Sequence, residues 1–111
     1  MNELAAMRDA MDAWDHQGVA SAIITIVGVQ GSSYRREGAQ MLVPATGAPV
    51  GAISGGCLEG DGIEIARRVI ATDAAESVTW NLHGDTDDDW GLGGGCNGII
   101  YARFEPLRGE V

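Results

Sequence analysis

The residues best suited to chemistry in this chain are its two cysteines, and each lies in a glycine-rich stretch. Cys57 follows Gly55 and Gly56, and Cys96 follows the run Gly93–Gly95. A thiolate is a nucleophile and a soft metal ligand, and glycines let a ligand approach the backbone closely. The two stretches together predict a glycine-lined pocket that presents two thiols.

The residues around Cys57 are typical of a short strand, a glycine turn and a helix start. The amides and the dipole at a helix start favour an anion, and they favour the thiolate form of a cysteine. We therefore predict a ligand site formed by Ser54, Gly55, Gly56, Cys57 and Glu59. The alternative is a buried structural cysteine followed by an acidic residue that is favourable in any first helical turn.

A third stretch, Gly31–Ala39, directly follows an apolar segment and combines hydroxyl groups with arginines. Loops at the end of a buried strand are frequent ligand sites. Ser32 and Ser33 with Arg35 and Arg36 could hold a phosphate, because a guanidinium forms a bidentate fork and hydroxyls add donors. A solvated turn with exposed arginines explains the same residues equally well.

The stretch before the last apolar segment matches a nucleotide-binding spacing, but its context is wrong. Gly93–Gly98 fits G-x-G-x-x-G, yet that fingerprint lies between a strand and a helix, and here a strand follows. We reject a Rossmann site and expect Gly95, Cys96 and Asn97 to line the thiol-bearing pocket instead. The nearby acidic run with His83 lacks a fixed ligand spacing and is more typical of a solvated loop.

Composition excludes several classes of protein. The 111 residues suit one domain, and 45% hydrophobic residues allow a core without disulfide bonds. A net charge of −9 and the lack of lysine argue against nucleic-acid binding, a Walker A loop and a lysine Schiff base. The chain has neither a secretory signal nor an apolar run of the ~20 residues that a membrane span needs, so we expect a cytoplasmic protein with free thiols.

Two helices are expected from apolar residues at helical spacing. The first covers Glu3–Gln17, with an apolar face that should pack on the core and contains Leu4, Met7, Met11 and Trp14. The second covers Cys57–Ala71, and its inward side should carry Leu58, Gly62, Ile65 and Val69. On its outer side we expect an ion pair between Glu64 and Arg68.

Five strands complete the expected fold. The first is apolar on both faces and should therefore be central and buried on both sides. The predicted strands are Ala20–Val29, Gln40–Val43, Val50–Ile53, Val78–Leu82 and Ile99–Phe104. We expect a small α/β domain in which two main helices pack on a mixed sheet of about five strands.

In this order, the three stretches resemble the amino-terminal domain of the XdhC/CoxI family, accessory proteins of xanthine dehydrogenase and carbon monoxide dehydrogenase. The resemblance covers nearly the whole chain, so we expect a single domain over residues 1–111, and its specificity lies in the combination. The matching residues are Gly31–Met41, Gly51–Glu59, Gly91–Leu92, Gly95–Gly98 and Glu105–Pro106. Gly94 departs from the pattern, because a larger residue is expected there.

The resemblance implies a protein that binds the molybdenum cofactor, assists its sulfuration and delivers it to an apo-hydroxylase, as a chaperone more than an enzyme. It places Cys57 and Cys96 near molybdenum or sulfur and Arg35 near the cofactor phosphate. Further implied partners are a sulfurtransferase or a separate Rossmann-domain chain. Many members of the family carry a carboxy-terminal Rossmann domain, whereas this chain ends at Val111 without one; a natural short member and a fragment fit equally.

Two other functions fit the same residues. Cys57 at a helix start could be the nucleophile of a sulfur-transfer enzyme, although no histidine occupies an obvious activating position. The acidic surface could instead belong to a cofactor-free protein adaptor for hydroxylase maturation. The sequence leaves open which hydroxylase is served and whether the chain forms a homo-oligomer.

Overall fold

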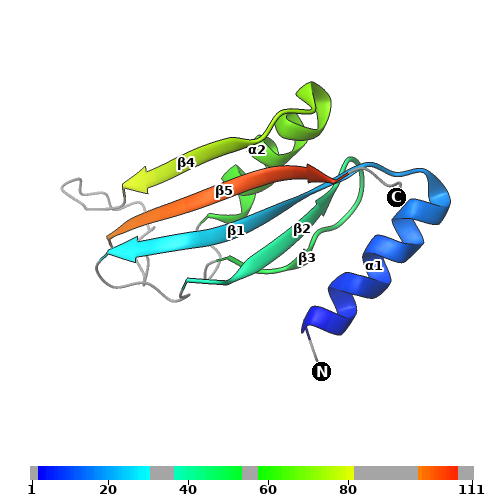
Figure 1. Ribbon diagram of the computed structural model, residues 1–111, viewed down its shortest axis with the longest axis horizontal. Helices are drawn as coiled ribbons and strands as arrows, with labels where there is room; N and C mark the ends of the chain where they lie inside the picture. Colours follow the sequence, from blue (N-terminus) through cyan, green and yellow to red (C-terminus); the bar gives the residue numbers. More distant parts are fainter. Residues whose placement is uncertain (1–2, 31–36, 54–57, 82–97, 108–111) are drawn as a thin grey trace.

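The computed structural model describes residues 3–30, 37–53, 58–81 and 98–107. Two helices and five strands follow one another along the chain, and all of them lie close to the predicted positions (Figure 1). They are α1 (Glu3–Gln17), β1 (Ser21–Gln30), β2 (Gln40–Pro44), β3 (Val50–Gly51), α2 (Glu59–Thr72), β4 (Glu76–Asn81) and β5 (Ile99–Leu107). The expected small α/β domain with five strands and two helices is confirmed.

The sheet has the order β3-β2-β1-β5-β4, and β1 is its central strand, as expected. All pairings among the described strands are antiparallel, so the expectation of a mixed sheet is wrong. The reason is the path of the helical connection. A helix usually joins neighbouring parallel strands, but α2 joins β3 to β4, and these strands lie at opposite edges of the sheet.

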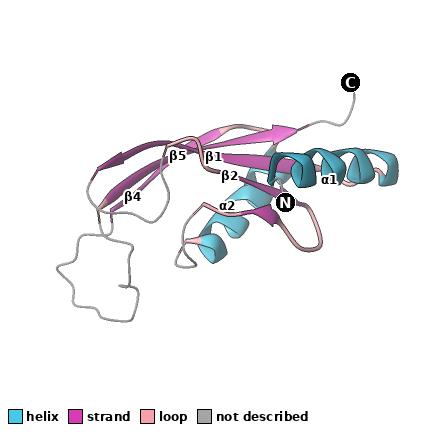
Figure 2. Cartoon of the chain, turned by 90° about the horizontal axis from the view of Figure 1, so that it is seen from below, coloured by secondary structure: helices cyan, strands magenta, loops and turns pink. Residues whose placement is uncertain are grey.

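The main core lies between the sheet and α2, which covers one face (Figure 2). All four residues predicted for the inward side of α2 are buried. Gly62 allows the helix to approach closely, because a Cβ there would lie 3.2 Å from the Cδ1 atoms of both Ile24 and Ile53. The start of α2 therefore lies directly over the middle of the sheet.

The opposite face is covered mainly near β3, where α1 lies. Met7 and Leu42 are buried outside the main core, but Val27 of β1 is 54% exposed. The prediction that β1 is buried on both sides is therefore wrong, because α1 lies beside the β3 edge instead of crossing the sheet (Figure 1). For the same reason Met11, predicted to pack on the core, is 39% exposed.

A β-bulge at Val27 changes which side chains of β1 face the core near the end of the strand. The register against β5 shifts between Ile26 and Gly28, so Val29 packs against the core while Gly28 lies under the ring of Tyr101. A Cβ on Gly28 would come within 3.1 Å of the Tyr101 Cδ2 atom. The bulge thus lets β1 face the core on both sides of the extra residue.

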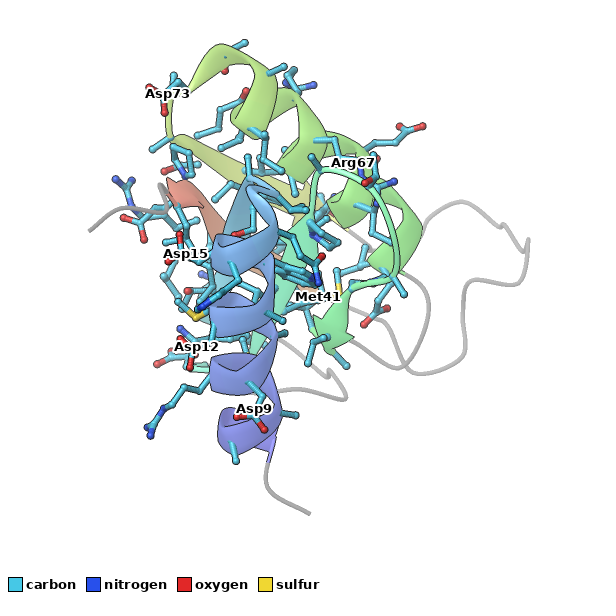
Figure 3. All side chains as sticks on the ribbon, turned by 90° about the vertical axis from the view of Figure 1, so that its right-hand side faces the viewer. Asp9, Asp12, Asp15, Met41, Arg67 and Asp73 are labelled. Atoms are coloured by element: carbon cyan, nitrogen blue, oxygen red, sulfur yellow. The ribbon has the colours of Figure 1, made fainter. Side chains whose placement is uncertain are left out.

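The strand β3 is shorter than predicted. It ends at Gly51, whose φ of +98° breaks the extended conformation, so Val50–Gly51 alone pairs with β2. Arg67 of α2 secures the β2–β3 connection by donating to the backbone carbonyls of Pro44 and Gly47 at 3.1 and 2.7 Å. Figure 3 shows Arg67 reaching toward this connection.

The far end of α2 is held by an ion pair that differs from the predicted one. Arg68 was expected to bind Glu64, but its guanidinium binds Glu76 of β4 through two hydrogen bonds of 2.9 and 2.5 Å. The hydrogen bond from Arg68 and its charge lower the pKa of the Glu76 carboxyl. Asp73, in the left-handed conformation, ends the helix and lets the chain turn directly into β4.

Candidate functional site

Segments 31–36 and 82–97 begin or end on three neighbouring strands at one end of the sheet. Gln30, the last residue of β1, lies opposite Ile99 of β5, and Ile99 lies opposite Asn81, the last residue of β4. In Figure 1 the ends of β1 and β4 and the start of β5 lie at the same end of the sheet. The predicted arginine-bearing and Cys96-bearing stretches are therefore joined to the sheet at the same end, which we call the root region and which is formed by Gln30, Asn81 and Ile99.

The first segment returns to the sheet through two backbone hydrogen bonds. Gly38 donates its N–H to the carbonyl of Ile26 at 2.8 Å, and Ile26 donates to the carbonyl of Ala39 at 2.9 Å. Gly38 has a φ of +95°, a conformation that a side chain would strain. Both ends of segment 31–36 are thus attached to β1 near its bulge.

The Cys57-bearing segment, residues 54–57, is bracketed by a side-chain contact. The backbone N–H of Ile53 donates to Glu59 Oε2 at 2.9 Å, and Ile53 is fully buried. Glu59 was predicted as a ligand-binding residue, and the structure gives its carboxylate a backbone partner. The carboxylate therefore joins the residue before the segment to the first turn of α2.

A second carboxylate of the same helical turn was not recognised in the sequence. The Trp80 indole Nε1–H donates to Asp61 Oδ2 at 2.6 Å, and the Trp80 ring packs edge-on against Phe104 with centroids 6.0 Å apart. This contact ties the start of α2 to the end of β4, immediately before segment 82–97. An acidic residue in a first helical turn and a tryptophan in a strand give no sign of being partners, because the contact depends on strand order.

Most of the predicted binding residues lie outside the described residues. Those not described are Ser32, Ser33, Arg35, Arg36, Ser54, Gly55, Gly56, Cys57, Gly95, Cys96 and Asn97. The acidic run with His83 lies outside as well. The described part of the chain thus defines the frame of the site, and the roles of these side chains stay predictions.

The described residues add two negative findings. In the ranges 3–30, 37–53, 58–81 and 98–107, histidine, cysteine, aspartate and glutamate form no group of three or more that could hold a metal ion. Neither helix in these ranges is long and apolar enough to cross a membrane.

Comparisons with known proteins agree with the fold and with the family resemblance. The model of the XdhC and CoxI family matches residues 14–81. A Bacillus subtilis (strain 168) protein, named as a probable xanthine dehydrogenase subunit, is 35% identical over 103 residues, covering 90% of this chain and 30% of that protein. A crystal structure of a xanthine dehydrogenase from Bacillus halodurans has a TM-score of 0.76 and 36% identity, covering 97% of this chain and 31% of that chain. The chain therefore spans under a third of the length of either protein.

Proposed function

Because the chain belongs to the XdhC and CoxI family, we propose that it binds the molybdenum cofactor as cargo and assists its sulfuration and insertion into a molybdenum hydroxylase. The names of the similar proteins point to a hydroxylase of the xanthine dehydrogenase kind as the partner. The observation that carries the proposal is the common root region of segments 31–36 and 82–97, with the start of α2 tied to it by Trp80.

The residue types in these segments suit such a cargo. The molybdenum cofactor combines a phosphate with a metal held by sulfur ligands, so a site for it needs anion-binding groups beside soft donors. Arg35 and Arg36 in one segment provide guanidinium forks, and Cys57 and Cys96 in the other two provide thiols. Neither kind of group alone would distinguish this cargo from a simple anion or a soft metal ion.

The overall charge makes local groups decisive. With a net charge of −9 the protein repels an anionic ligand at long range, so attraction must come from groups close to the phosphate. The carboxylates in the first turn of α2, Glu59 and Asp61, each accept a hydrogen bond from this chain. A hydrogen bond from a neutral N–H orients a carboxylate but does not cancel its charge, so these two groups do not supply the attraction.

The delivery step is tested by reconstitution of a cofactor-free hydroxylase. Apo-hydroxylase of the xanthine dehydrogenase kind is mixed with freshly released cofactor, with or without this protein, and the recovery of hydroxylase activity is followed over time. We expect faster and more complete recovery with the wild-type protein and none of this gain with Cys57→Ser, whose volume is almost unchanged. An unrelated acidic protein is the control for non-specific protection of the cofactor.

Two results would contradict the proposal. Recovery that is the same with and without this protein would remove delivery as its function. A Cys57→Ser variant that is folded and fully active would show that the thiol takes no part in it.

A further inference from the structure

We propose that the outer edge of β4 pairs with the β4 edge of a second copy of this chain, so that two five-stranded sheets join into one. Among the described strands, β4 pairs with β5 alone and forms one edge of the sheet (Figure 1). An edge strand presents unpaired backbone N–H and C=O groups, which favour pairing with another strand. The proposal concerns assembly and does not depend on cofactor binding.

The edges of the sheet are protected to different degrees. At the opposite edge, β3 pairs over Val50–Gly51 only, ends at a glycine with a φ of +98° and lies against α1. Where β5 extends past the start of β4 it carries Pro106, which lacks a backbone N–H. By contrast, β4 pairs in unbroken register over six residues without proline or lysine, and its one charged residue, Glu76, is bound by Arg68. Of these edges, β4 is therefore the one that can accept a further strand.

The direction of the backbone groups in the sheet follows from two hydrogen bonds of β1. Ala20 accepts a hydrogen bond from the N–H of Ala45 at 2.8 Å, just beyond β2. Ile26 donates its N–H to the carbonyl of Ala39 at 2.9 Å, just before β2. The even-numbered residues of β1 before the bulge thus direct their backbone groups toward β2, and the odd-numbered residues bond to β5.

The same alternation continues to the outer edge. Arg103 lies opposite an odd-numbered residue of β1 and bonds to it, so Ala102 beside it bonds to β4. Ala102 lies opposite Val78, which therefore directs its backbone groups toward β5. The two neighbours of Val78, Ser77 and Thr79, consequently direct their N–H and C=O groups outward. Both residues are exposed, and within the described part of the chain neither has a backbone partner on that outer side.

A two-fold axis at Val78 matches these outward groups. Antiparallel pairing about this residue places Ser77 opposite Thr79 of the second copy on both sides of the axis, and each such pair can exchange both of its N–H···O bonds. Hydroxyl side chains directly opposite each other are favourable on a sheet face. Val78 packs on the core but stays partly exposed, and it would meet its own copy in the close, non-hydrogen-bonded position. The contact would bury apolar surface at the axis.

The charges on α2 suit the same axis. Asp61 accepts a hydrogen bond from Trp80 near the end of β4, and Arg68 binds Glu76 at the start of β4. The pairing places Trp80 opposite Glu76 of the second copy, so Asp61 of each copy comes level with Arg68 of the other. Glu64 is exposed and lies farther round the helix, away from the sheet. The β4 edge is thus complementary to itself in hydrogen bonding and in charge.

Sedimentation velocity at increasing protein concentration measures the association. We expect a reversible dimer for the wild type. Thr79→Pro removes an outward N–H from each copy, and proline is tolerated in an edge strand where the N–H faces solvent, so the monomer should stay folded. Because symmetry removes two N–H···O bonds, the dimer Kd should rise roughly tenfold or more. Thr79→Val is the matched control, since it keeps the N–H and the β-branched shape and should dimerise like the wild type.

A disulfide cross-link tests the position of the axis. In a chain whose Cys57 and Cys96 are replaced by serine, Val78→Cys brings two thiols together across the axis. The Cα separation of ~4.5 Å in a non-hydrogen-bonded pair suits a disulfide. Thr79→Cys is the control, because the two copies of residue 79 would lie more than ~7 Å apart, too far for the bond. Under mild oxidation with glutathione we expect a covalent dimer of Val78→Cys and little of Thr79→Cys.

Three results would overturn the proposal. The first is a wild-type protein that stays monomeric at every concentration, which would leave this edge for a strand of a different protein. The others are a dimer that Thr79→Pro leaves unchanged and equal disulfide formation at the two cysteine positions. Thermal unfolding of each variant confirms that it is folded; if Thr79→Pro is not, Ser77→Pro and the two cysteine variants still decide the question.

Discussion

Glycine at position 51 illustrates how a single residue shapes the frame of the candidate site. Its φ of +98° ends β3 and turns the chain toward Ile53, the residue before the Cys57-bearing segment. A Cβ at this position would lie 2.6 Å from the carbonyl oxygen of Gln40, a backbone atom that cannot rotate away. The strand end and the contact of Ile53 with Glu59 therefore both depend on a missing side chain.

Gly51→Ala is expected to destabilise the domain by about 1–3 kcal/mol, because it adds a strained backbone conformation to a steric clash. The free energy of unfolding is measured by urea denaturation. Gly60→Ala is a matched control, because Gly60 lies in the helix α2 and a Cβ there would meet nothing within 4 Å. That control should be neutral or stabilising by up to ~1 kcal/mol. Equal effects of the two changes would show that the left-handed conformation of Gly51 is not required.

Arg35→Ala tests the predicted phosphate contact. A hydrogen bond to a charged group is worth ~1.5–3 kcal/mol, so cofactor affinity should fall roughly ten- to a hundredfold while the thermal midpoint stays near that of wild type. Affinity is measured by equilibrium dialysis of the released cofactor. Arg103→Ala is the control, since Arg103 is exposed on β5 and binds Glu105. An unchanged affinity of Arg35→Ala would place the phosphate elsewhere.

The helix α2 is the element that organises the described part of the site. It crosses one face of the sheet between β3 and β4, and it contacts the chain on both sides through Glu59, Asp61, Arg67 and Arg68. Its first turn binds Ile53 and Trp80, which lie just before the cysteine-bearing segments, and its last turns are joined to Glu76 of β4. Loss of the Arg68–Glu76 ion pair at the last turns should therefore leave the contacts of Glu59 and Asp61 in place.

The ion pair at that far end gives a pH dependence with a definite sign. The pKa of Glu76 is lowered from its ordinary 4.5 by the hydrogen bond and charge of Arg68. A carboxyl whose pKa is lower in the folded state adds stability that is full above its unfolded pKa and is lost as pH falls through the folded pKa. Glu76→Gln should thus lower the thermal midpoint slightly near neutral pH, and the difference from wild type should begin to shrink below pH 4.5 and vanish only below the lowered pKa of the folded protein.

Thermal unfolding of both proteins between acidic and neutral pH measures this difference. Glu64→Gln is the control, because it removes a carboxylate from the same helix and its Arg68 neighbour binds Glu76 instead. A difference that persists unchanged in acid would show that the Glu76 carboxylate is not the cause.

Much of the element pattern could be predicted from the sequence because it is local. Glu3–Gln17 was predicted with the bounds that the structure has, since helical spacing and Gly18 mark both the body and the end of α1. The bulge at Val27 could not be predicted, because one extra residue in an apolar strand leaves no signal in composition. The antiparallel strand order and the Asp61–Trp80 contact could not be predicted either, because both depend on α2 joining opposite edges of the sheet.

The candidate site was predicted less completely than the fold. The three stretches were correctly recognised as neighbours of strand and helix ends, but of the predicted binding residues the structure describes Glu59 alone. Glu59 was predicted from its place in the helix start around Cys57, whereas its hydrogen bond to Ile53 depends on how the chain folds between them. Residue type indicates which chemistry is available, whereas strand order decides which residues meet.

At the scale of the whole molecule, the two faces of the sheet differ. One face is covered by α2 and forms the main core, while the other leaves part of β1 and β5 accessible, with Val27 and Arg103 exposed. Aspartates along α1 add to the acidic surface (Figure 3). The site frame lies at one end of this layered structure, where neither helix crosses the sheet ends of β1, β5 and β4 (Figure 1).

The central claim is that this domain itself holds the molybdenum cofactor, and retention of the cofactor tests it most directly. Metal-depleted protein is incubated with freshly released cofactor, unbound ligand is removed by gel filtration, and molybdenum and oxidised pterin are measured in the protein fraction. The account predicts that both are retained together in a constant ratio, well above the amount found with an unrelated acidic protein. Retention no greater than that control would contradict cofactor binding and leave a cofactor-free adaptor as the function to test.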